Sequence, residues 1–329
     1  MSSVRWKSIV AVVTNPFAQE QLAAVKAAAL AARCGARLTL FNAFMIPQPT
    51  PDAPMDSAGE IIAGAIRDRR KQLQRLAKRL GRGELRIRVA VKWDFPAHEA
   101  IVRHVLETKP DVVVAESHRH GRIARWILAN TDWELIRSCP APIWFVRSAQ
   151  LPRRPRVLVG VDPQHTHAKP ARLDDRLLAA ANALQQQLGG QVSLAHAYEP
   201  PLSAGPGMLM EPIRLPLPAK RSREFAAHVA DAVRKLADRH GIEPAHCMLQ
   251  QGAASEVLPR IAQSRKIDVL VMGAVSRSLL ARPVIGSTAE RVIDRVACDV
   301  FIIKPAGFKT PVQRKAARAS VSRSRRRAA

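Results

Sequence analysis

The sequence predicts an α/β protein built from two open parallel-sheet domains in tandem. Its 329 residues suffice for about two domains of ~150 residues each. In each half, short apolar runs alternate with segments of helical period, and the second half repeats the first. Strands that are apolar throughout, separated by helices, predict parallel sheets covered by helices on both faces.

The elements follow the same order in both halves. In the first half, strands are predicted near 8–14, 37–44, 85–93, 111–116 and 142–147, and helices near 18–34, 58–80, 97–107 and 130–138. In the second half, strands are predicted near 156–162, 191–198, 245–251, 267–273 and 299–304, and helices near 173–188, 219–240, 254–265 and 287–297. Gly35 is expected just past the end of the first helix, as a C′ glycine.

The repeat is read from matching segments. Asp111–Glu116 aligns with Asp268–Gly273, and with the same offset Ile143–Arg147 aligns with Val300–Lys304. Near the two starts, Val10–Pro16 matches Leu158–Pro163. We therefore predict three parts. They are a domain at 1–150, a second domain at 151–305 and a tail at 306–329.

The charge of the chain is strongly positive. There are 52 Lys and Arg residues against 27 Asp and Glu, a net charge of +25. The tail is rich in Ala, Ser and Arg and carries no acidic residue, which is typical of a disordered segment. Two interpretations stand for it, namely non-specific contact with nucleic acid or another polyanion, and a solubilising extension.

Composition excludes several classes of protein. No apolar run approaches the roughly 20 residues of a membrane span, and residues 1–16 lack a secretory signal. The four scattered cysteines favour reduced thiols, so we expect a cytoplasmic protein. His118 with His120, and His165 with His167, supply too few ligands for a structural metal. No catalytic triad, nucleophile elbow or HExxH motif is present, which favours binding over catalysis.

One segment carries a candidate site. The apolar run 269–272 leads to Gly273, and Gly286-Ser287-Thr288 opens the next helix. Glycine and serine at such bends let backbone N–H groups approach a ligand, and a helix N-terminus attracts anions. The segment resembles the nucleotide loop of universal stress proteins, whose pattern is Gly, two residues, Gly, nine residues, Gly, then Ser or Thr. Here Ser276 replaces the second glycine, which predicts strain if φ is positive there.

The resemblance extends over both halves. The duplication, Thr131–Trp133, Cys139–Pro142 and Thr310–Val312 resemble the tandem E-type universal stress proteins. This resemblance implies two Rossmann-like domains of the adenine-nucleotide alpha hydrolase kind, packed as a pseudo-dimer. It also implies that the final strands, 142–147 and 299–304, approach each other.

The resemblance further implies site residues. The adenine of ATP would lie against Asp162 and the backbone of Ala197. The ribose and phosphates would lie on Gly273, Ser276, Gly286, Ser287 and Thr288, with Arg277 beside them. Each role has a structural alternative. Asp162 before proline opens a turn, Ser287–Glu290 forms a capping box, and Arg277 is a solvated cation.

The first half departs from the pattern. Asn15 is aligned with Asp162, Glu116 replaces Gly273, Arg119 replaces Ser276, and Ala129-Asn130 replaces Gly286-Ser287. A carboxylate at the phosphate turn repels a nucleotide, so we expect ATP in the second domain only.

Three functional hypotheses follow. The first is a stress-response binding protein in which a nucleotide biases the loops 199–220 and 274–286 and a protein partner, whose identity is unknown, receives the signal. The second is an interaction protein without nucleotide, which binds an apolar, lipid-like molecule or a protein through its cavity or its Pro-rich loop 199–220. The third, a slow ATPase, is the least favoured because no general base is visible.

Overall fold

The computed structural model describes residues 5–45, 55–81, 85–117, 130–164, 172–200, 203–204, 214–215, 218–276 and 284–313. The first lobe contains β1 (Ser8–Val12), α1 (Leu22–Cys34), β2 (Arg37–Phe44), α2 (Met55–Leu80), β3 (Ile87–Trp93), α3 (Ala97–Thr108), β4 (Val112–Glu116), α4 (Asn130–Ser138) and β5 (Ile143–Val146). The second lobe contains β6 (Arg156–Gly160), α5 (Leu173–Leu188), β7 (Gln191–Tyr198), β8 (Ser203–Ala204), β9 (Arg214–Leu215), α6 (Ala219–Arg239), the 3-10 turn Pro244–His246, β10 (Cys247–Gln251), α7 (Ala254–Ser264), β11 (Val269–Met272), β12 (Val275–Ser276), β13 (Val284–Ile285), α8 (Ser287–Arg295) and β14 (Asp299–Ile302).

Ten strands form one continuous sheet in the order β10-β7-β6-β11-β14-β5-β4-β1-β2-β3. Within each lobe the strands pair in parallel, whereas β5 and β14 pair antiparallel at the junction, with Phe301 opposite Trp144. The prediction that the final strands of the two halves approach each other is confirmed. Because this pairing joins two sheet edges, it protects both from contact with other chains.

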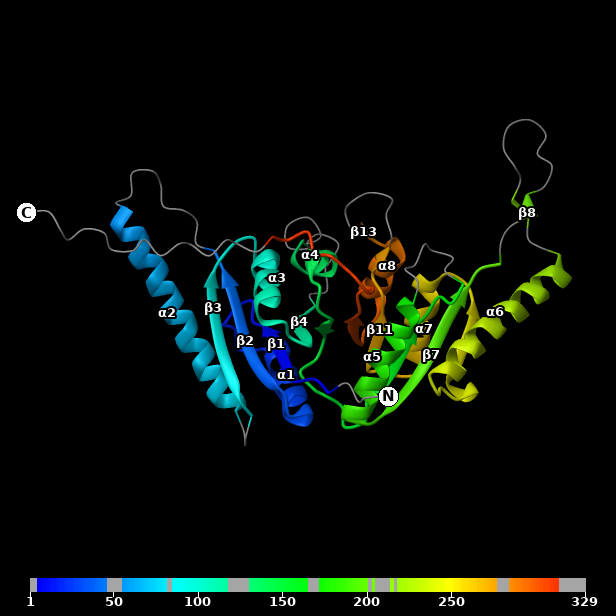
Figure 1. Ribbon diagram of the computed structural model, residues 1–329, viewed down its shortest axis with the longest axis horizontal. Coiled ribbons are helices and arrows are strands. Elements are labelled where there is room, and N and C mark those ends of the chain that lie inside the picture. Colours follow the sequence, from blue (N-terminus) through cyan, green and yellow to red (C-terminus); the bar gives the residue numbers. More distant parts are fainter. Residues whose placement is uncertain are drawn as a thin grey trace, which may run out of the picture.

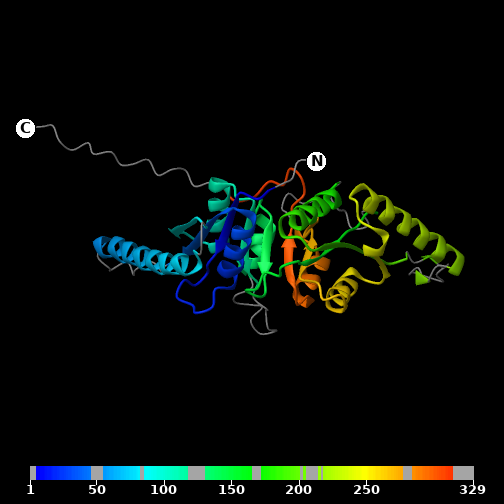
Figure 2. The ribbon, with the colours of Figure 1, turned by 90° about the horizontal axis from the view of Figure 1, so that it is seen from below.

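Helices cover both faces of the sheet. One buried core contains side chains of α1, α2, α5 and α6, and the other contains side chains of α3, α4, α7 and α8. Both cores extend across the two lobes. Figure 1 shows α2 and α6 at the two far ends of the molecule, and Figure 2 shows the lobes side by side along its long axis. The predicted fold class, two open parallel-sheet domains forming a pseudo-dimer, is confirmed.

Aromatic side chains join the lobes on one face of the sheet. The ring centroids of Trp6 and Phe301 are 5.8 Å apart, and those of Trp144 and Phe301 are 5.6 Å apart. Arg33 of α1 donates to the main-chain oxygens of Pro152 and Arg153, at 2.7 and 2.6 Å. Trp144 is 1% exposed, as expected for a packing tryptophan.

Local signals placed most element ends correctly. Gly35 takes φ 64° past the end of α1, as its C′ position requires. The helix itself begins at Leu22, not at residue 18. The preceding residues form a turn in which Asn15 Oδ1 accepts the N–H of Phe17 at 3.0 Å and Gln21 Nε2 donates to Asn15 O at 2.8 Å. Such side-chain bonds compete with a helical start.

The structure describes part of the remaining predictions. All four cysteines are free thiols, and Cys34 and Cys139 are buried. Across the described ranges, no helix is both long enough and apolar enough to cross a membrane. The His118–His120 and His165–His167 pairs, most of the Pro-rich loop 199–220 and tail residues 314–329 lie outside the described residues.

Candidate functional site

The second-lobe site lies at the switch in strand order. β6 pairs with β7 on one side and with β11 on the other, so the chain leaves β6 and β11 at neighbouring points of the same sheet edge. Asp162 follows β6 and Gly273 follows β11. Ligands of open parallel sheets bind at this position. Buried His196 of β7 fixes the end of β6, because its Nδ1 donates to Val161 O at 2.8 Å.

A cavity of about 160 Å³ opens at this edge. We call it the second-lobe groove. Its wall includes five of the sequence-predicted site residues, namely Asp162, Ala197, Gly273, Gly286 and Thr288. The rest of the wall is mostly apolar and includes Val161, Leu173, Ala254, Leu258, Met272, Ala274 and Ala289. Residues from β6, β7, β11 and α8 thus meet at one place.

The loop after Gly273 is closed by a short ladder. Val275 and Ser276 of β12 pair antiparallel with Ile285 and Val284 of β13, and the N–H of Gly286 donates to Ala274 O at 3.1 Å. Ser276 is therefore extended. Among the described non-glycine residues, positive φ occurs at Lys109, Arg172 and Lys266. The strain predicted for serine at position 276 is absent, because a paired strand residue needs no left-handed backbone. Arg277 lies outside the described residues.

The N-terminus of α8 faces the groove through Gly286. Gly286 is the N-cap residue, with φ −69° and ψ 133°, and as a glycine it has no side chain to cap the helix. Ser287 is the first helical residue, so the predicted capping box is wrong. In a capping box the hydroxyl belongs to the N-cap residue itself. The N-cap residue therefore supplies no side-chain acceptor to the first N–H groups of α8, and a helix N-terminus favours anions.

Two wall features escaped the sequence-based prediction. Leu173, the first residue of α5, packs so closely on Gly273 that a Cβ there would lie 2.7 Å from Leu173 Cδ2. Asp174 accepts the backbone N–H of Asp162 at 3.2 Å. The small residue at position 273 thus accommodates a leucine of the protein itself. An acidic residue in the first turn of the helix after β6 was the available signal for Asp174.

The first lobe has different contacts at the corresponding position. Glu116, which replaces Gly273, accepts the N–H of Ala23 at 3.3 Å, at the start of α1. The structure also corrects one alignment between the two halves. Asn42 Nδ2 donates to Val13 O at 2.7 Å, and His196 makes the same bond to Val161 O, so Val13 corresponds to Val161. The next residue, Thr14, is therefore the counterpart of Asp162, and not Asn15.

The chemistry of the second-lobe groove is that of a binding site. Asp162 is the one carboxylate of its described wall, and that wall contains no histidine, cysteine or lysine. In the described part of the chain, no cluster of three or more His, Cys, Asp or Glu residues could hold a metal ion. The wall offers apolar surface, one carboxylate, one hydroxyl and backbone N–H groups.

The chain is similar to known proteins over most of its length. The sequence profile of the Universal stress protein family matches residues 6–147 and 154–304. Universal stress protein E of Escherichia coli strain K12 is 28% identical over 309 residues, 92% of this chain and 95% of that protein. Universal stress protein E of Photorhabdus laumondii is 26% identical over 309 residues, 92% of this chain and 96% of that protein.

Two solved structures show the same fold across both lobes. A protein of unknown function from Pseudomonas aeruginosa PAO1 has a TM-score of 0.63 at 20% identity, over 91% of this chain and 93% of that chain. A universal stress protein from Archaeoglobus fulgidus DSM 4304 has a TM-score of 0.55 at 14% identity, over 90% of this chain and 96% of that chain.

Proposed function

The chain belongs to the universal stress protein family as a tandem member of the E type, and from this premise we propose that its second lobe binds ATP or another adenine nucleotide. One observation carries the proposal. Asp162, Gly273, Gly286 and Thr288, far apart in the sequence, line a single groove beside the uncapped N-terminus of α8. Such a terminus favours phosphate groups.

The proposed roles follow the position of each residue. Asp162 and the backbone of Ala197 contact adenine, whose flat faces suit the apolar wall of Leu258 and Met272. Gly273, Ser276, Gly286, Ser287 and Thr288 hold the ribose and phosphates, and Arg277 neutralises phosphate charge. The extended backbone of Ser276 supports this assignment, since serine there carries no left-handed strain.

Only the second lobe is proposed to bind nucleotide. In the first lobe the Glu116 carboxylate lies at the start of α1, where its charge would repel phosphate. We accordingly retain three units, a first domain at 1–150, a nucleotide-binding domain at 151–305 and a basic tail at 306–329. The tail adds non-specific contact with polyanions.

We propose that the protein acts through binding rather than through catalysis. Its described groove wall has no histidine, cysteine or lysine to serve as a base or nucleophile. Nucleotide would bias the loops at 199–220 and 274–286, and a protein partner would receive the change. Four free cysteines support action in the cytoplasm, where thiols stay reduced.

Substitutions at Gly286 test the nucleotide proposal. An added Cβ at Gly286 meets nothing within 4 Å, so Gly286→Ala should leave ATP binding intact. Asp and Asn are both favoured N-cap residues, and each should stabilise the unliganded protein by a few tenths of a kcal/mol. Only Gly286→Asp adds a negative charge beside the phosphates.

The measurement is thermal unfolding with and without millimolar ATP. Wild type and Gly286→Ala should be protected by ATP, and Gly286→Asp should lose that protection. Gly286→Asn adds an N-cap side chain without a charge, so it separates the effect of the negative charge from that of helix capping. Protection of Gly286→Asp equal to that of wild type would remove the groove assignment, and a stoichiometry of two nucleotides per chain would contradict the restriction to one lobe.

A second candidate function rests on the shape of the groove. Its volume of about 160 Å³ lies below the range of ~300–1,000 Å³ usual for small-molecule pockets, and its wall is mostly apolar. These features favour a small apolar or lipid-like ligand as the alternative. Mass spectrometry of gently purified protein separates the two, because co-purifying nucleotide supports the first function and an apolar metabolite the second.

A further inference from the structure

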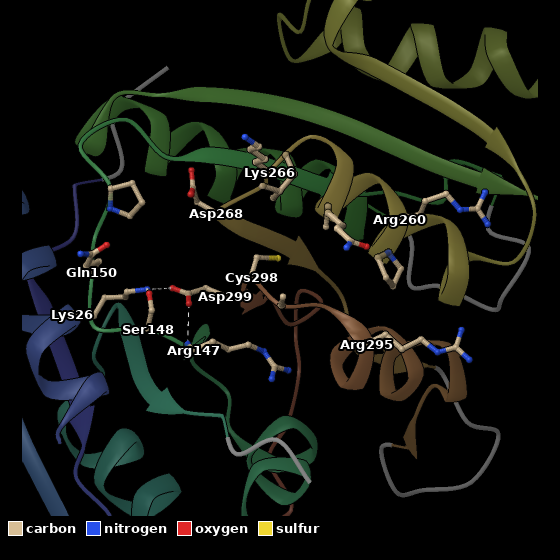
Figure 3. A pocket seen from close by; sticks show the side chains of 16 residues that line it. Lys26, Arg147, Ser148, Gln150, Arg260, Lys266, Asp268, Arg295, Cys298 and Asp299 are labelled. Atoms are coloured by element: carbon tan, nitrogen blue, oxygen red, sulfur yellow. Dashed lines mark hydrogen bonds and ion pairs between the residues drawn. The ribbon is translucent and has the colours of Figure 1, made fainter. Parts of the chain in front are cut away.

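A second, larger cavity lies between the two lobes, away from the second-lobe groove. Its volume is about 760 Å³, within the range of small-molecule sites. Asp268 and Asp299 of its wall precede or begin β11 and β14, whereas Gly273 of the groove follows β11. The two cavities therefore lie at opposite ends of β11. Figure 3 shows the wall of this junction cavity, formed by side chains of both lobes.

The wall is strongly cationic. It carries five basic side chains, namely Lys26 and Arg147 from the first lobe and Arg260, Lys266 and Arg295 from the second, against Asp268 and Asp299. A cleft lined by one sign of charge concentrates its field and attracts ions of the opposite sign. Arg260 and Arg295 extend in the same direction from α7 and α8 at the outer end of the cavity, with their guanidinium groups pointing away from Cys298 and Asp299 (Figure 3). Arg295 Nη1 also donates to Ser255 O at 3.1 Å.

Both acidic residues are already engaged within the protein. Asp299 pairs with Lys26 and accepts the indole N–H of Trp144 and the backbone N–H of Arg147, each at 2.9 Å. Asp268 accepts the backbone N–H of Arg156 at 2.7 Å, with the Arg156 Nε 3.7 Å away. Asp299 thus neutralises Lys26, one of the five cations, so the positive charge of the cavity comes from Arg147, Arg260, Lys266 and Arg295.

The remaining polar groups of the wall add no negative charge, since Ser148, Gln150 and Gln263 are neutral. Cys298 is half-buried, and burial, followed by the nearby Asp299, raises the pKa of its thiol to about 11. The thiol stays neutral at pH 7. An anion in the cavity would therefore meet cations, neutral polar groups and apolar surface.

Lys266 occupies a position where glycine is usual. It has φ 49° at the C′ position of α7, where its N–H donates to Gln263 O at 3.1 Å and the N–H of Ile267 donates to Ala262 O at 2.8 Å. Helices ordinarily end in this motif with glycine, and a side chain there strains the backbone. Lys109, at the end of α3 in the first lobe, has the same conformation with φ 46°, so the motif recurs in both lobes.

We propose that the junction cavity binds a small anion carrying at least two phosphate groups, held by cations of both lobes. Arg260 and Lys266 contribute the second-lobe contacts. Arg147, whose Nη2 also donates to Ile293 O at 2.6 Å, contributes charge from the first lobe. Guanidinium groups bind phosphate through paired N–H donors. Because such a ligand contacts both lobes, it would stabilise their junction. The proposal does not depend on nucleotide binding in the second-lobe groove.

A competing explanation is that Lys266 and Arg295 only complement the C-terminal ends of α7 and α8, since cations are favourable there. Under that explanation their removal lowers stability and leaves anion binding unchanged. The two explanations thus predict different binding results for the same variant.

Titration calorimetry with inorganic triphosphate at physiological salt, on the full chain, tests the proposal. The double variant Arg260→Gln/Lys266→Gln removes two cavity charges from exposed side chains. The matched control, Arg70→Gln/Lys71→Gln, removes two exposed charges from α2. We expect at least about tenfold weaker binding in the cavity variant, the equivalent of one lost charge-assisted contact, and near-wild-type affinity in the control.

Three results would overturn the proposal. One is an absence of triphosphate binding to wild type. Another is an equal loss in the cavity variant and the α2 control, which would indicate general attraction to a basic surface. The third is loss of binding in Gly286→Asp, which would place the triphosphate in the second-lobe groove. Arg260→Gln alone, at an exposed side chain of α7, serves as the cavity variant if the double variant does not fold.

Discussion

Lys26 of α1 and Asp299 of β14 form a buried ion pair across the lobe junction, with side chains 3% and 5% exposed. Asp299 also accepts N–H groups of Trp144 and Arg147, whereas Lys26 has a further contact only with the Ser148 hydroxyl, at 3.4 Å, among the described residues. The carboxylate is thus the better-supported partner. A buried charge that loses its counter-ion is costly, because neither water nor another ion replaces the interaction.

We predict that Asp299→Asn destabilises the protein by ~3–5 kcal/mol, since it leaves the Lys26 ammonium buried without a counter-ion. Lys26→Met should cost less, because Asp299 keeps two N–H donors. Urea unfolding of both single variants and of the double variant measures the coupling. A larger loss for Lys26→Met than for Asp299→Asn would show that the carboxylate is not the better-supported partner.

The close packing of Leu173 on Gly273 gives a second prediction. Gly273→Ala places a Cβ 2.7 Å from Leu173 Cδ2, and overpacking of this kind costs ~1–3 kcal/mol. Leu173→Ala leaves a cavity and costs ~2–5 kcal/mol. In the double variant the added methyl group has room, so the loss of stability should be smaller than the sum of the losses in the two single variants. Strict additivity in urea unfolding would mean that the two side chains do not meet.

His104 predicts how stability changes in acid. It is 5% exposed and stacks on Phe41 with ring centroids 4.3 Å apart. Burial, with a smaller effect of Lys92, lowers its pKa from 6.5 to about 4, against the opposing effect of Glu107. Between these pH values the unfolded chain binds a proton that the folded protein does not. Stability should therefore fall by up to about 3 kcal/mol as pH drops from 6.5 to 4.

His104→Phe should remove this part of the acid sensitivity while the ring still packs on Phe41. Free energies of unfolding at pH 7, 5.5 and 4 for wild type and variant provide the measurement. If the pH dependence of the variant equals that of wild type, His104 does not titrate as proposed.

Lys304 predicts how stability changes at alkaline pH. Its side chain is buried at 2% exposure, and its ammonium lies 4.7 Å from the ring centroid of Phe308. Burial lowers the pKa of Lys304 from 10.5 to about 8, with Cys139 opposing. Between pH 8 and 10.5 the unfolded chain holds the extra proton, so the contribution of this group to stability rises with pH in that window.

Lys304→Met should therefore stabilise the protein at pH 7, by at most about 3 kcal/mol, reduced by the loss of the cation–π contact. The variant should also reduce the increase in stability between pH 8 and 10.5. Lys304→Arg is the matched control, because arginine stays charged throughout and should lower stability at every pH. Destabilisation by Lys304→Met at pH 7 would contradict the assignment.

Much of the fold followed from local sequence. The predicted helix near 287–297 corresponds to α8, Ser287–Arg295, and that near 130–138 corresponds to α4, Asn130–Ser138. The errors lie at helix starts. Side-chain bonds in the turn at Asn15–Gln21 delay the start of α1, and the N-cap of α8 is set by the backbone angles of one residue. Hydrophobic periodicity does not specify where either helix begins.

The candidate site was partly predictable in the same sense. The resemblance to the nucleotide loop of universal stress proteins implied five residues that line the second-lobe groove. Leu173, which fills space above Gly273, was not predicted, because a leucine at the start of a helix is ordinary by composition. The counterpart of Asp162 in the first lobe required the sheet register, since alignment on proline shifted it by one residue.

The sequence by itself determined the tandem family, the order of strands and helices and the position of the groove residues. The order of elements depends on apolar periodicity, turn residues and duplication, which are local or repeated signals, whereas the family and the groove residues came from the resemblance of the loop after β11 to a known motif. The tertiary structure alone decided how the lobes meet, through Lys26 and Asp299, and enclosed the cationic junction cavity between them. Those features join residues that are distant in the chain, and their charges and packing acquire meaning only when folding brings them within a few ångströms.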